Sequence, residues 1–151
     1  DWPGHLGPVD GTPGNDSMIP GYADAEGDVI GAGDDIINGG IGAEMVSGGE
    51  GNDTIIGADG FDTINGDAGN DTLNGNAGND TISGGDGDDL IDGGIGADVL
   101  NGDAGNDTIT ALEGFDTISG GAGNDTIEGN AGNDTIDGGL GADDIRGGQG
   151  I

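Results

Sequence analysis

An all-β fold, a parallel solenoid of short strands, is predicted by three observations on this chain of 151 residues. A unit of nine residues repeats without insertion from about Ile30 to the end of the chain. Its fourth column is always Gly and its sixth is always acidic. Its eighth column is aliphatic throughout, from Ile37 to Ile145. A short fixed period of this kind is typical of a solenoid, in which every unit adds one strand and one turn.

Each unit divides into a turn and a strand. Residues 66–70, Gly-Asp-Ala-Gly-Asn, put Gly or Asn where a turn needs positive φ. Residues 71–74 alternate, so Leu73 is expected to face inward and its two neighbours outward. We expect only about three extended residues per unit and two units, 18 residues, per flattened coil. The predicted fold is therefore a parallel β-roll (β-solenoid) with two short-stranded parallel sheets.

Stacking by 18 residues makes the eighth column the whole predicted core. One face of this core comprises Ile37, Ile55, Leu73, Ile91, Ile109, Ile127 and Ile145, and the other comprises Val46, Ile64, Ile82, Leu100, Ile118 and Ile136. Thirteen aliphatic side chains are a thin core for a chain of this length. Apolar burial alone is therefore not expected to hold the fold.

The composition is strongly acidic, with 31 Asp and Glu against one basic residue, Arg146, and a formal net charge of −30. Without the repeat, such a chain with 40 Gly is typical of disorder. The sign of the charge excludes nucleic acid and anionic membrane surfaces as partners. Divalent cations are the natural counterpart.

The same stacking places the sixth-column carboxylates in two rows, one along each edge of the coil, about 5 Å apart within a row. The candidate metal ligands are Asp35, Glu44, Asp53, Asp62, Asp71, Asp80, Asp89, Asp98, Asp107, Asp116, Asp125, Asp134 and Asp143. Empty rows would repel, whereas hard cations between the carboxylates would attract them. Ca²⁺ accepts irregular sets of carboxylate and carbonyl oxygens, and the gaps within the two rows predict about 11 ions. Transition metals are disfavoured because the only His is His5 and Cys is absent.

These residues resemble the RTX (repeats-in-toxin) family, whose nonapeptide Gly-Gly-x-Gly-x-Asp-x-U-x is matched by residues 48–56 and about a dozen neighbouring units. The resemblance implies a parallel β-roll with Ca²⁺ in the turns, held by the sixth-column carboxylate and turn carbonyl oxygens. Glu44 departs from this pattern by replacing Asp, and its longer side chain is expected to misplace the ligand oxygen. In the first column Ile30 and Ala111 replace Gly. The second-column replacements are Ala58, Asp67, Asn76, Asp103, Leu112 and Asn130.

Two segments are predicted: residues 1–29, an irregular cap or partial first coil, and residues 30–151, the calcium-binding β-roll. Residues 11–19 fit one more unit, but the next ten residues are one too many for the period. Trp2, Met18 and Tyr22 could cover the open end of the core, with a frayed tail as the alternative. The chain begins at Asp1 and stops in mid-unit, so we expect either a processed piece of a longer protein or coils that stack between chains.

A longer period lies inside the short one. The sequence Gly-Phe-Asp-Thr-Ile at 60–64 recurs at 114–118, three coils further on. Phe61 and Phe115 are therefore expected on the same edge, either as a relic of duplication or as a strip for self-association. Outward Thr also stack, as in Thr54 over Thr72, which an ice-binding face would need. Ice binding is disfavoured, because Ala, Glu and Asp occupy the third column of the turns.

Function follows from the carboxylate rows. Saturated Ca²⁺ ligands are poor general bases, and with one His and no Lys or Cys we expect no enzyme here. The sequence favours a calcium-binding structural module of a secreted or surface bacterial protein. It would fold on Ca²⁺ binding outside the cell, and its coils could stack into filaments. The alternative is a folding and export domain attached to a larger secreted enzyme or toxin.

Overall fold

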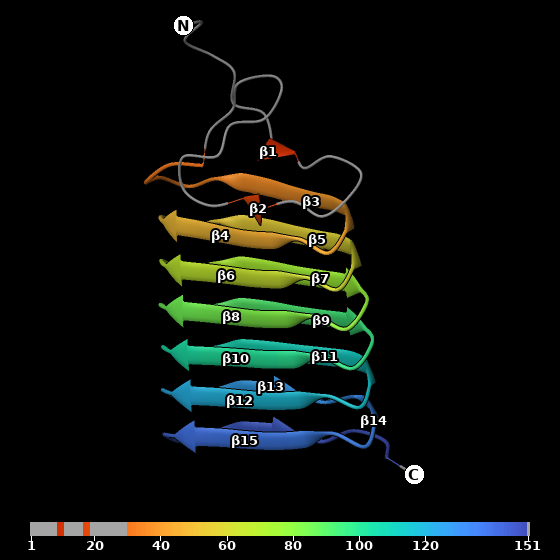
Figure 1. Ribbon diagram of the computed structural model, residues 1–151. Coiled ribbons are helices and arrows are strands. Elements are labelled where there is room, and N and C mark those ends of the chain that lie inside the picture. Colours follow the sequence, from red (N-terminus) through yellow and green to blue (C-terminus); the bar gives the residue numbers. More distant parts are fainter. Residues whose placement is uncertain (1–8, 11–16, 19–29, 151) are drawn as a thin grey trace, which may run out of the picture.

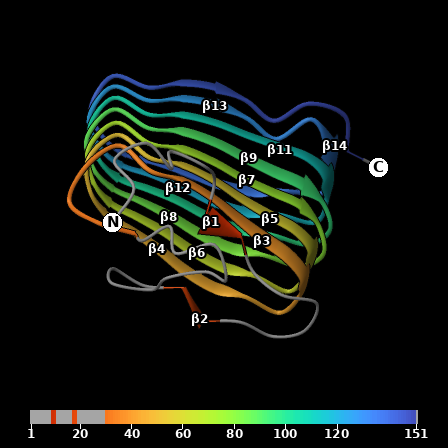
Figure 2. The same cartoon turned by 90° about the horizontal axis from the view of Figure 1, so that it is seen from above.

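The computed structural model describes residues 9–10, 17–18 and 30–150, and the repeat region forms a parallel β-roll (Figure 1). Seen from above, the coil is flattened, with one sheet on each side and a turn at each end (Figure 2). Every strand pairing in the two sheets is parallel. The described part of the chain has no helix that is long and apolar enough to cross a membrane.

Alternate strands belong to alternate sheets. Sheet 1 contains β1 (Val9–Asp10), β3 (Ile36–Gly42), β5 (Thr54–Gly60), β7 (Thr72–Ala77), β9 (Leu90–Ile95), β11 (Thr108–Gly114), β13 (Thr126–Glu128) and β16 (Asp144–Arg146), with β14 (Ala131–Gly132) also paired to β11. Sheet 2 contains β2 (Ser17–Met18), β4 (Met45–Glu50), β6 (Thr63–Ala68), β8 (Thr81–Asp86), β10 (Val99–Ala104), β12 (Thr117–Ala122) and β15 (Thr135–Leu140).

The register confirms the coil of 18 residues. Ile55 pairs with Leu73 in sheet 1, and Leu100 pairs with Ile118 in sheet 2. At the N-terminal end the step is longer, because Met18 pairs with Val46, 28 residues further on. The offset exceeds the usual 18 by ten residues, which is the length of the segment that breaks the period in the sequence. The boundary of the cap at residue 29 remains a prediction.

The eighth column forms the core, as predicted. Every member from Ile37 to Ile127 is buried, Ile136 packs partly against this cluster, and Ile145 in the last described coil is 44% exposed. At the other end Met18 is fully buried and extends the core. Trp2 and Tyr22, the other two side chains expected to cover this end, lie outside the described residues. The core is one aliphatic side chain thick on each sheet, so it is as thin as the sequence indicates.

The strands are longer than predicted, and this expectation was wrong. In the central coils each strand has six or seven residues, as in Thr72–Ala77 and Thr54–Gly60, and only two or three residues separate it from the next strand. The second column has positive φ in the middle of the extended segment, for example 74° at Asp67 and 108° at its pairing partner Gly85. Because neighbouring coils kink at the same position, their strands stay paired on both sides of the kink. A prediction from one unit alone therefore gives too short a strand, because it does not include the pairing between neighbouring coils.

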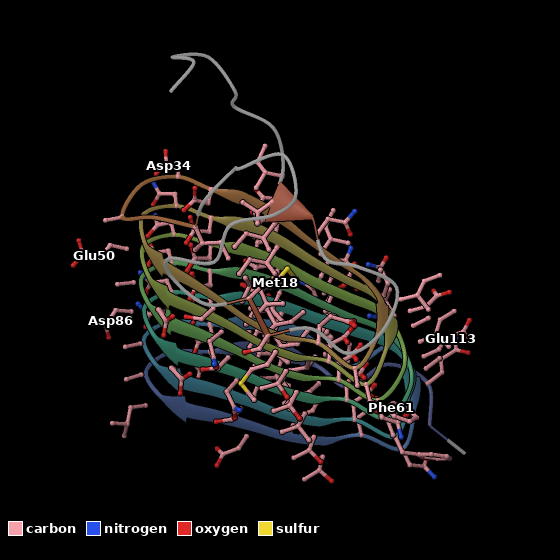
Figure 3. The ribbon with its side chains drawn as sticks, turned by 45° about the horizontal axis from the view of Figure 1, so that its top comes forward. Met18, Asp34, Glu50, Phe61, Asp86 and Glu113 are labelled. Atoms are coloured by element: carbon pink, nitrogen blue, oxygen red, sulfur yellow. The ribbon has the colours of Figure 1, made fainter. Side chains whose placement is uncertain are left out.

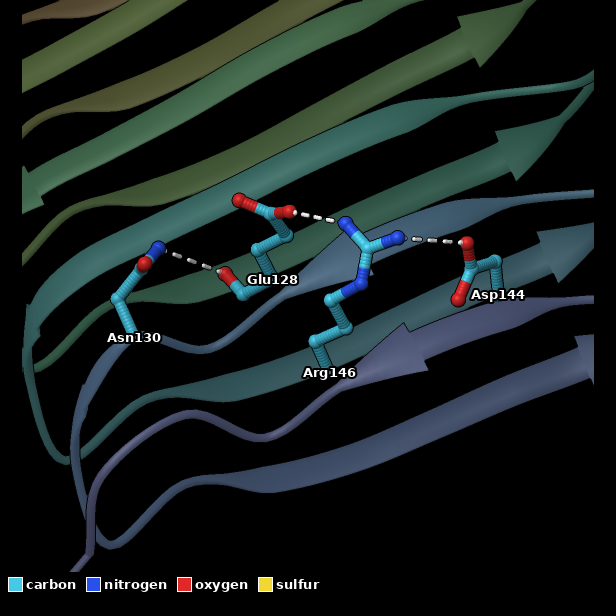
Figure 4. A network of polar contacts seen from close by, with 4 residues as sticks. All are labelled: Glu128, Asn130, Asp144 and Arg146. Carbon is cyan, nitrogen blue, oxygen red and sulfur yellow. Dashed lines mark hydrogen bonds and ion pairs between the residues drawn. The ribbon is translucent and has the colours of Figure 1, made fainter.

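Arg146, the only basic residue of the chain, lies in β16 near the C-terminal end (Figure 4). Its guanidinium donates to Glu128 Oε1 at 2.7 Å and to Asp144 Oδ2 at 3.2 Å. These pairs are exposed, and exposed pairs contribute little, typically about 0–1 kcal/mol. The negative charge of the repeats is therefore not balanced by side chains of this chain.

Candidate calcium sites in the turns

Each coil turns twice, and every sixth-column residue ends one of these turns. We call the turns that lead into sheet 2 the Phe edge, and those that lead into sheet 1 the Asn edge. The Phe edge comprises turns 42–44, 60–62, 78–80, 96–98, 114–116 and 132–134, and the Asn edge comprises turns 33–35, 51–53, 69–71, 87–89, 105–107, 123–125 and 141–143. Figure 3 shows Phe61 and Glu113 at one end of the coil and Asp34, Glu50 and Asp86 at the other.

The sixth-column carboxylates point into the coil. Along the chain the buried positions alternate through the sixth, eighth and first columns, as in Asp53, Ile55 and Gly57. Residues at most 3% exposed are Glu44, Asp53, Asp62, Asp71, Asp80, Asp89, Asp98, Asp107, Asp116 and Asp125. Asp35, Asp134 and Asp143 are half-buried. Aspartate is almost never fully buried unless it is paired, so this set needs a partner.

From Asp53 to Asp143, one oxygen of each sixth-column carboxylate accepts a backbone N–H from the coil before it. The backbone N–H of Asp53 donates to Asp71 Oδ1 at 2.7 Å, and that of Asp71 donates to Asp89 Oδ1 at 2.8 Å. The same bond recurs along both edges, from Glu44 N–H to Asp62 Oδ1 and from Asp98 N–H to Asp116 Oδ1. These bonds confirm that the sixth-column residues stack in two rows.

The second oxygen is different, since within the described residues it is buried and accepts no hydrogen bond. This holds for Oδ2 of Asp53, Asp62, Asp71, Asp80, Asp89, Asp98, Asp107, Asp116, Asp125 and Asp134. A buried polar atom without a partner costs about 1–3 kcal/mol, and a charged one costs more. Ten such oxygens at equivalent positions indicate a ligand that recurs with the coil.

First-column glycines make room for these oxygens. A Cβ on Gly66 would lie 2.3 Å from Asp71 Oδ2 and 2.5 Å from the carbonyl oxygen of Gly84, one coil further on. The φ of Gly66 is not in the left-handed range, so this glycine is needed for space rather than for conformation. A free carboxylate oxygen and a backbone carbonyl oxygen thus border the same small space. Both are oxygen ligands of the kind that Ca²⁺ prefers.

Most fourth-column glycines meet both requirements at once. Gly78 has a φ of 147°, and a Cβ there would lie 1.4 Å from the carbonyl oxygen of Gly60. Gly60 and Gly114 lack a positive φ, but a Cβ there would lie 1.6 Å and 1.7 Å from carbonyl oxygens of the preceding coil. From Gly51 to Gly141 any side chain would therefore collide with the preceding coil, which accounts for the absence of exceptions over that range.

Several of the buried carboxylates are harder to ionise than ordinary aspartates. Burial raises the pKa of Asp53, Asp80 and Asp107 to about 6 and that of Asp89 to about 7. The N–H of the preceding coil lowers each pKa, but neighbouring carboxylates raise it again. Without a metal, these four carboxylates can therefore bind a proton near neutral pH, and a cation would compete with that proton.

Three predicted ligands differ from the ten aspartates with a buried, unpaired Oδ2. Oδ2 of Asp35 accepts the backbone N–H of Gly31 at 2.9 Å, so this oxygen is already used. Glu44 is 1% exposed, and its backbone N–H donates to the next coil. Asp143 is half-buried, and its Oδ1 accepts the N–H of Asp125 at 3.1 Å, but its Oδ2 is not among the buried oxygens without a partner. All three stay candidates, on weaker grounds than the ten.

Sequence reasoning missed the fifth column. On the Asn edge its side chains accept backbone N–H groups from the following coil, as in Asn70 N–H to Asn52 Oδ1 at 2.8 Å and Asp88 N–H to Asn70 Oδ1 at 3.0 Å. The fifth and sixth residues therefore bind the coils on opposite sides. The recurring Asn at this column was the signal. Asp92, on the outer face of sheet 1, was also missed: its Oδ1 is buried without a partner, and burial raises its pKa.

Within the described residues no three Asp, Glu or His side chains converge on one point. A cation in these turns must therefore combine one or two carboxylates with backbone carbonyl oxygens, and the space beside first-column glycines such as Gly66 offers that combination. The carboxylates approach it from inside the coil. The residues present thus fit Ca²⁺.

This fold and these turns define a class, the metal-binding parallel β-solenoids with acidic turns. Comparison with protein families matches the RTX calcium-binding nonapeptide repeat at residues 31–55, 47–82, 65–100, 75–109, 83–118, 101–136 and 119–151. The chain belongs to this family, and it is an RTX calcium-binding β-roll repeat module. The family is a structural calcium-binding one rather than a catalytic one. The comparison with curated proteins gave no match.

Proposed function

We propose that the sixth-column carboxylates hold about 11 Ca²⁺ ions in the two edges, each completed by turn carbonyl oxygens. The observation that carries this proposal is the set of ten buried Oδ2 atoms without a hydrogen-bond partner. The proposed ligands are Asp35, Glu44, Asp53, Asp62, Asp71, Asp80, Asp89, Asp98, Asp107, Asp116, Asp125, Asp134 and Asp143.

Calcium would act on the chain as its folding partner. About 11 ions bring about +22 to a chain of formal charge −30, and the residual negative charge keeps the roll soluble. Because the buried carboxylates repel one another without the metal, binding energy becomes folding energy. We expect an unfolded chain in chelator and a β-roll in millimolar Ca²⁺.

A calcium titration followed by circular dichroism and by ion counting tests this function. The matched variants are Asp89→Asn, which changes a buried ligand, and Asp86→Asn, which changes an exposed carboxylate three residues away. We expect D89N to bind fewer ions and to need more Ca²⁺ for folding, whereas D86N behaves as wild type. Mg²⁺ should not replace Ca²⁺. Equal β content in chelator and in Ca²⁺ would refute the proposal.

A secreted or cell-surface location follows from the same dependence. Extracellular Ca²⁺ is millimolar, so a chain that folds only on metal could be exported unfolded and fold outside. The half-saturating Ca²⁺ concentration tests this idea: a value near the millimolar range agrees with it, and folding at submicromolar Ca²⁺ contradicts it.

For the wider role we propose a structural module that self-associates, with a folding and export domain of a larger secreted enzyme or toxin as the alternative. Phe61 and Phe115 favour the first role, since they are 68% and 63% exposed on the same edge. Coil ends that stack between chains would extend such contacts into filaments. Electron microscopy in millimolar Ca²⁺ tests both ideas, with Phe61→Ser/Phe115→Ser as the variant. Monodisperse wild-type particles would refute self-association, and filaments unaffected by the double variant would exclude the Phe contact.

A further inference from the structure

The turns that end at Asp62 and Asp116 form an internal matched pair. Both lie on the Phe edge, three coils apart, and both read Gly-Phe-Asp-Thr-Ile. They differ in the three columns before this motif, and only the first of these faces the carboxylate: the Asp62 turn has Gly57 there and the Asp116 turn has Ala111. Ala111 is fully buried, so its methyl group occupies the interior of the coil.

At the Gly57 position there is no room for that methyl group. A Cβ on Gly57 would lie 2.5 Å from Asp62 Oδ2, whereas ordinary contacts begin near 3.4 Å. Ala111 carries a real Cβ at this position, so the Asp116 carboxylate has to lie elsewhere. A Cβ built on Gly114 would lie 2.4 Å from Asp116 Oδ1, but the equivalent distance from Gly60 to Asp62 Oδ1 is 2.8 Å. The Asp116 carboxylate is thus closer to the fourth-column glycine.

The displaced carboxylate is still buried and still needs a cation. Asp116 is 1% exposed and its Oδ2 accepts no hydrogen bond from the described residues. The space that a carboxylate and a carbonyl oxygen share in the other turns is filled here by a methyl group, which cannot ligate a metal. Ligand distances around Ca²⁺ span only about 2.3–2.6 Å, so a shift of a few tenths of an ångström weakens coordination.

We propose that Ala111 makes the Asp116 turn a weaker calcium site than the Asp62 turn, so that the Asp116 turn releases its ion earlier. This inference rests on the proposed function, because it assumes that the sixth-column carboxylates bind Ca²⁺. Disturbed metal surroundings typically lower affinity by about 10- to 100-fold, and we expect a difference of this size at Asp116.

Release of Ca²⁺ into a fluorescent chelator, counted per chain in a stopped-flow experiment, tests the inference with two reciprocal variants. Wild type should show an early phase that Ala111→Gly abolishes. Gly57→Ala should add a second early phase of the same size, from the Asp62 turn. Gly57 has no positive φ and Ala111 occupies the same column, so alanine is conformationally permitted there. Circular dichroism at saturating Ca²⁺ checks that each variant folds.

Stability separates this role from simple packing. Loss of a buried methyl group by itself lowers stability, whereas A111G should unfold at a higher temperature than wild type when Ca²⁺ is present. If wild type binds calcium but A111G leaves both the release phases and the ion affinities unchanged, the inference is overturned and the proposed function stands. If wild type binds no calcium, both are overturned. If G57A does not fold, A111G alone decides.

Discussion

The two edges of the roll share their interior and differ outside. Both carry a row of buried sixth-column carboxylates. On the Asn edge the fifth column adds an uninterrupted ladder, in which each side chain accepts an N–H from the next coil; its acceptors are Asp34, Asn52, Asn70, Asp88, Asn106 and Asn124. On the Phe edge the fifth column reads Ala43, Phe61, Asn79, Ala97, Phe115 and Asn133. Both edges share the sixth-column bonds between coils, but only the Asn edge adds an uninterrupted fifth-column ladder; on the Phe edge the N–H of Ala97 donates to Asn79 Oδ1 at 2.9 Å.

The two edges also differ in backbone strain and in exposed apolar surface. Leading into the Phe edge, Ala58 and Leu112 adopt positive φ, at 80° and 74°, a conformation that costs most residues about 1–2 kcal/mol. Leading into the Asn edge, the second column of β4 to β15 is Gly or Asp, which accept it more readily. Ile41 and Ile95 add apolar side chains to the Phe edge, at 66% and 61% exposure. Among the described residues the Phe edge thus combines less favourable backbone conformations with more exposed apolar side chains, whereas the third column of the Asn edge has one large apolar residue, Leu140, at 75% exposure.

Partial removal of calcium should reveal the largest difference between the two edges. Because the Phe edge lacks a continuous fifth-column ladder, we expect its turns to open first. Backbone amides of turns 60–62 and 114–116 should then lose protection from hydrogen exchange before those of turns 69–71 and 105–107. Complete chelation should unfold both edges. Equal loss of protection on both edges would show that the ladder contributes nothing.

Acid should partly replace calcium. Without metal, folding raises the pKa of Asp53, Asp80 and Asp107 from 3.8 to about 6, and that of Asp89 to about 7. The folded state therefore binds more protons than the unfolded state between pH 4 and 7, and the metal-free fold gains stability as pH falls through that window. Calcium affinity should fall over the same range. Circular dichroism in chelator at pH 7 and pH 4.5 measures the effect; a loss of β content on acidification would contradict it.

Removing one rung of the ladder should cost stability on the Asn edge. In Asn70→Ala the N–H of Asp88 loses its acceptor, and we expect a loss of about 1 kcal/mol in Ca²⁺. Ala97→Gly, on the Phe edge, is the control: its side chain accepts no bond, and the backbone N–H that donates to Asn79 Oδ1 at 2.9 Å is kept. Thermal unfolding at saturating Ca²⁺ measures both, and a wild-type melting temperature for N70A would remove the ladder from the account.

Relieving strain should stabilise the Phe edge. Leu112→Gly removes a side chain that is held at positive φ, and we expect a gain of about 0.5–1 kcal/mol after the entropic cost of glycine. Asp67→Gly is the corresponding change on the other edge; its gain should be smaller, because Asp tolerates this conformation better and because the change also removes the bond that Asp67 Oδ2 accepts from Ser47 Oγ. A destabilised L112G would mean that the packing of Leu112 outweighs its strain.

The smallest expected effect comes from adding a rung. Phe61→Asn places an acceptor where the Asn edge has one, within reach of the N–H of residue 79, and we expect a gain of about 0.5 kcal/mol. Phe61→Ser removes the ring without adding an amide and is the control. Thermal melts of the two variants separate the ladder from the loss of an exposed ring; equal melting temperatures would count against the ladder.

The architecture could be predicted from the sequence because every nine-residue unit shows the same pattern of glycine, acidic and aliphatic columns. One eighth-column position is ambiguous, but thirteen in register identify the inward face, and a half-coil of nine residues places the acidic column in two rows. The predicted strand length of about three residues was wrong. The positive φ at Asp67 suggests a turn when one unit is considered, but the paired strands on both sides of it keep the segment extended.

By itself, the sequence determined the period, the coil of two units, the aliphatic core and the two acidic rows, because each follows from counting along a chain that repeats. Only the tertiary structure decided that the carboxylates turn inward, that Gly66 and its equivalents leave room for them, and that Asn70 and its equivalents bind the neighbouring coil. These features depend on contacts between residues 18 apart, whose direction and spacing exist only once the coils are stacked.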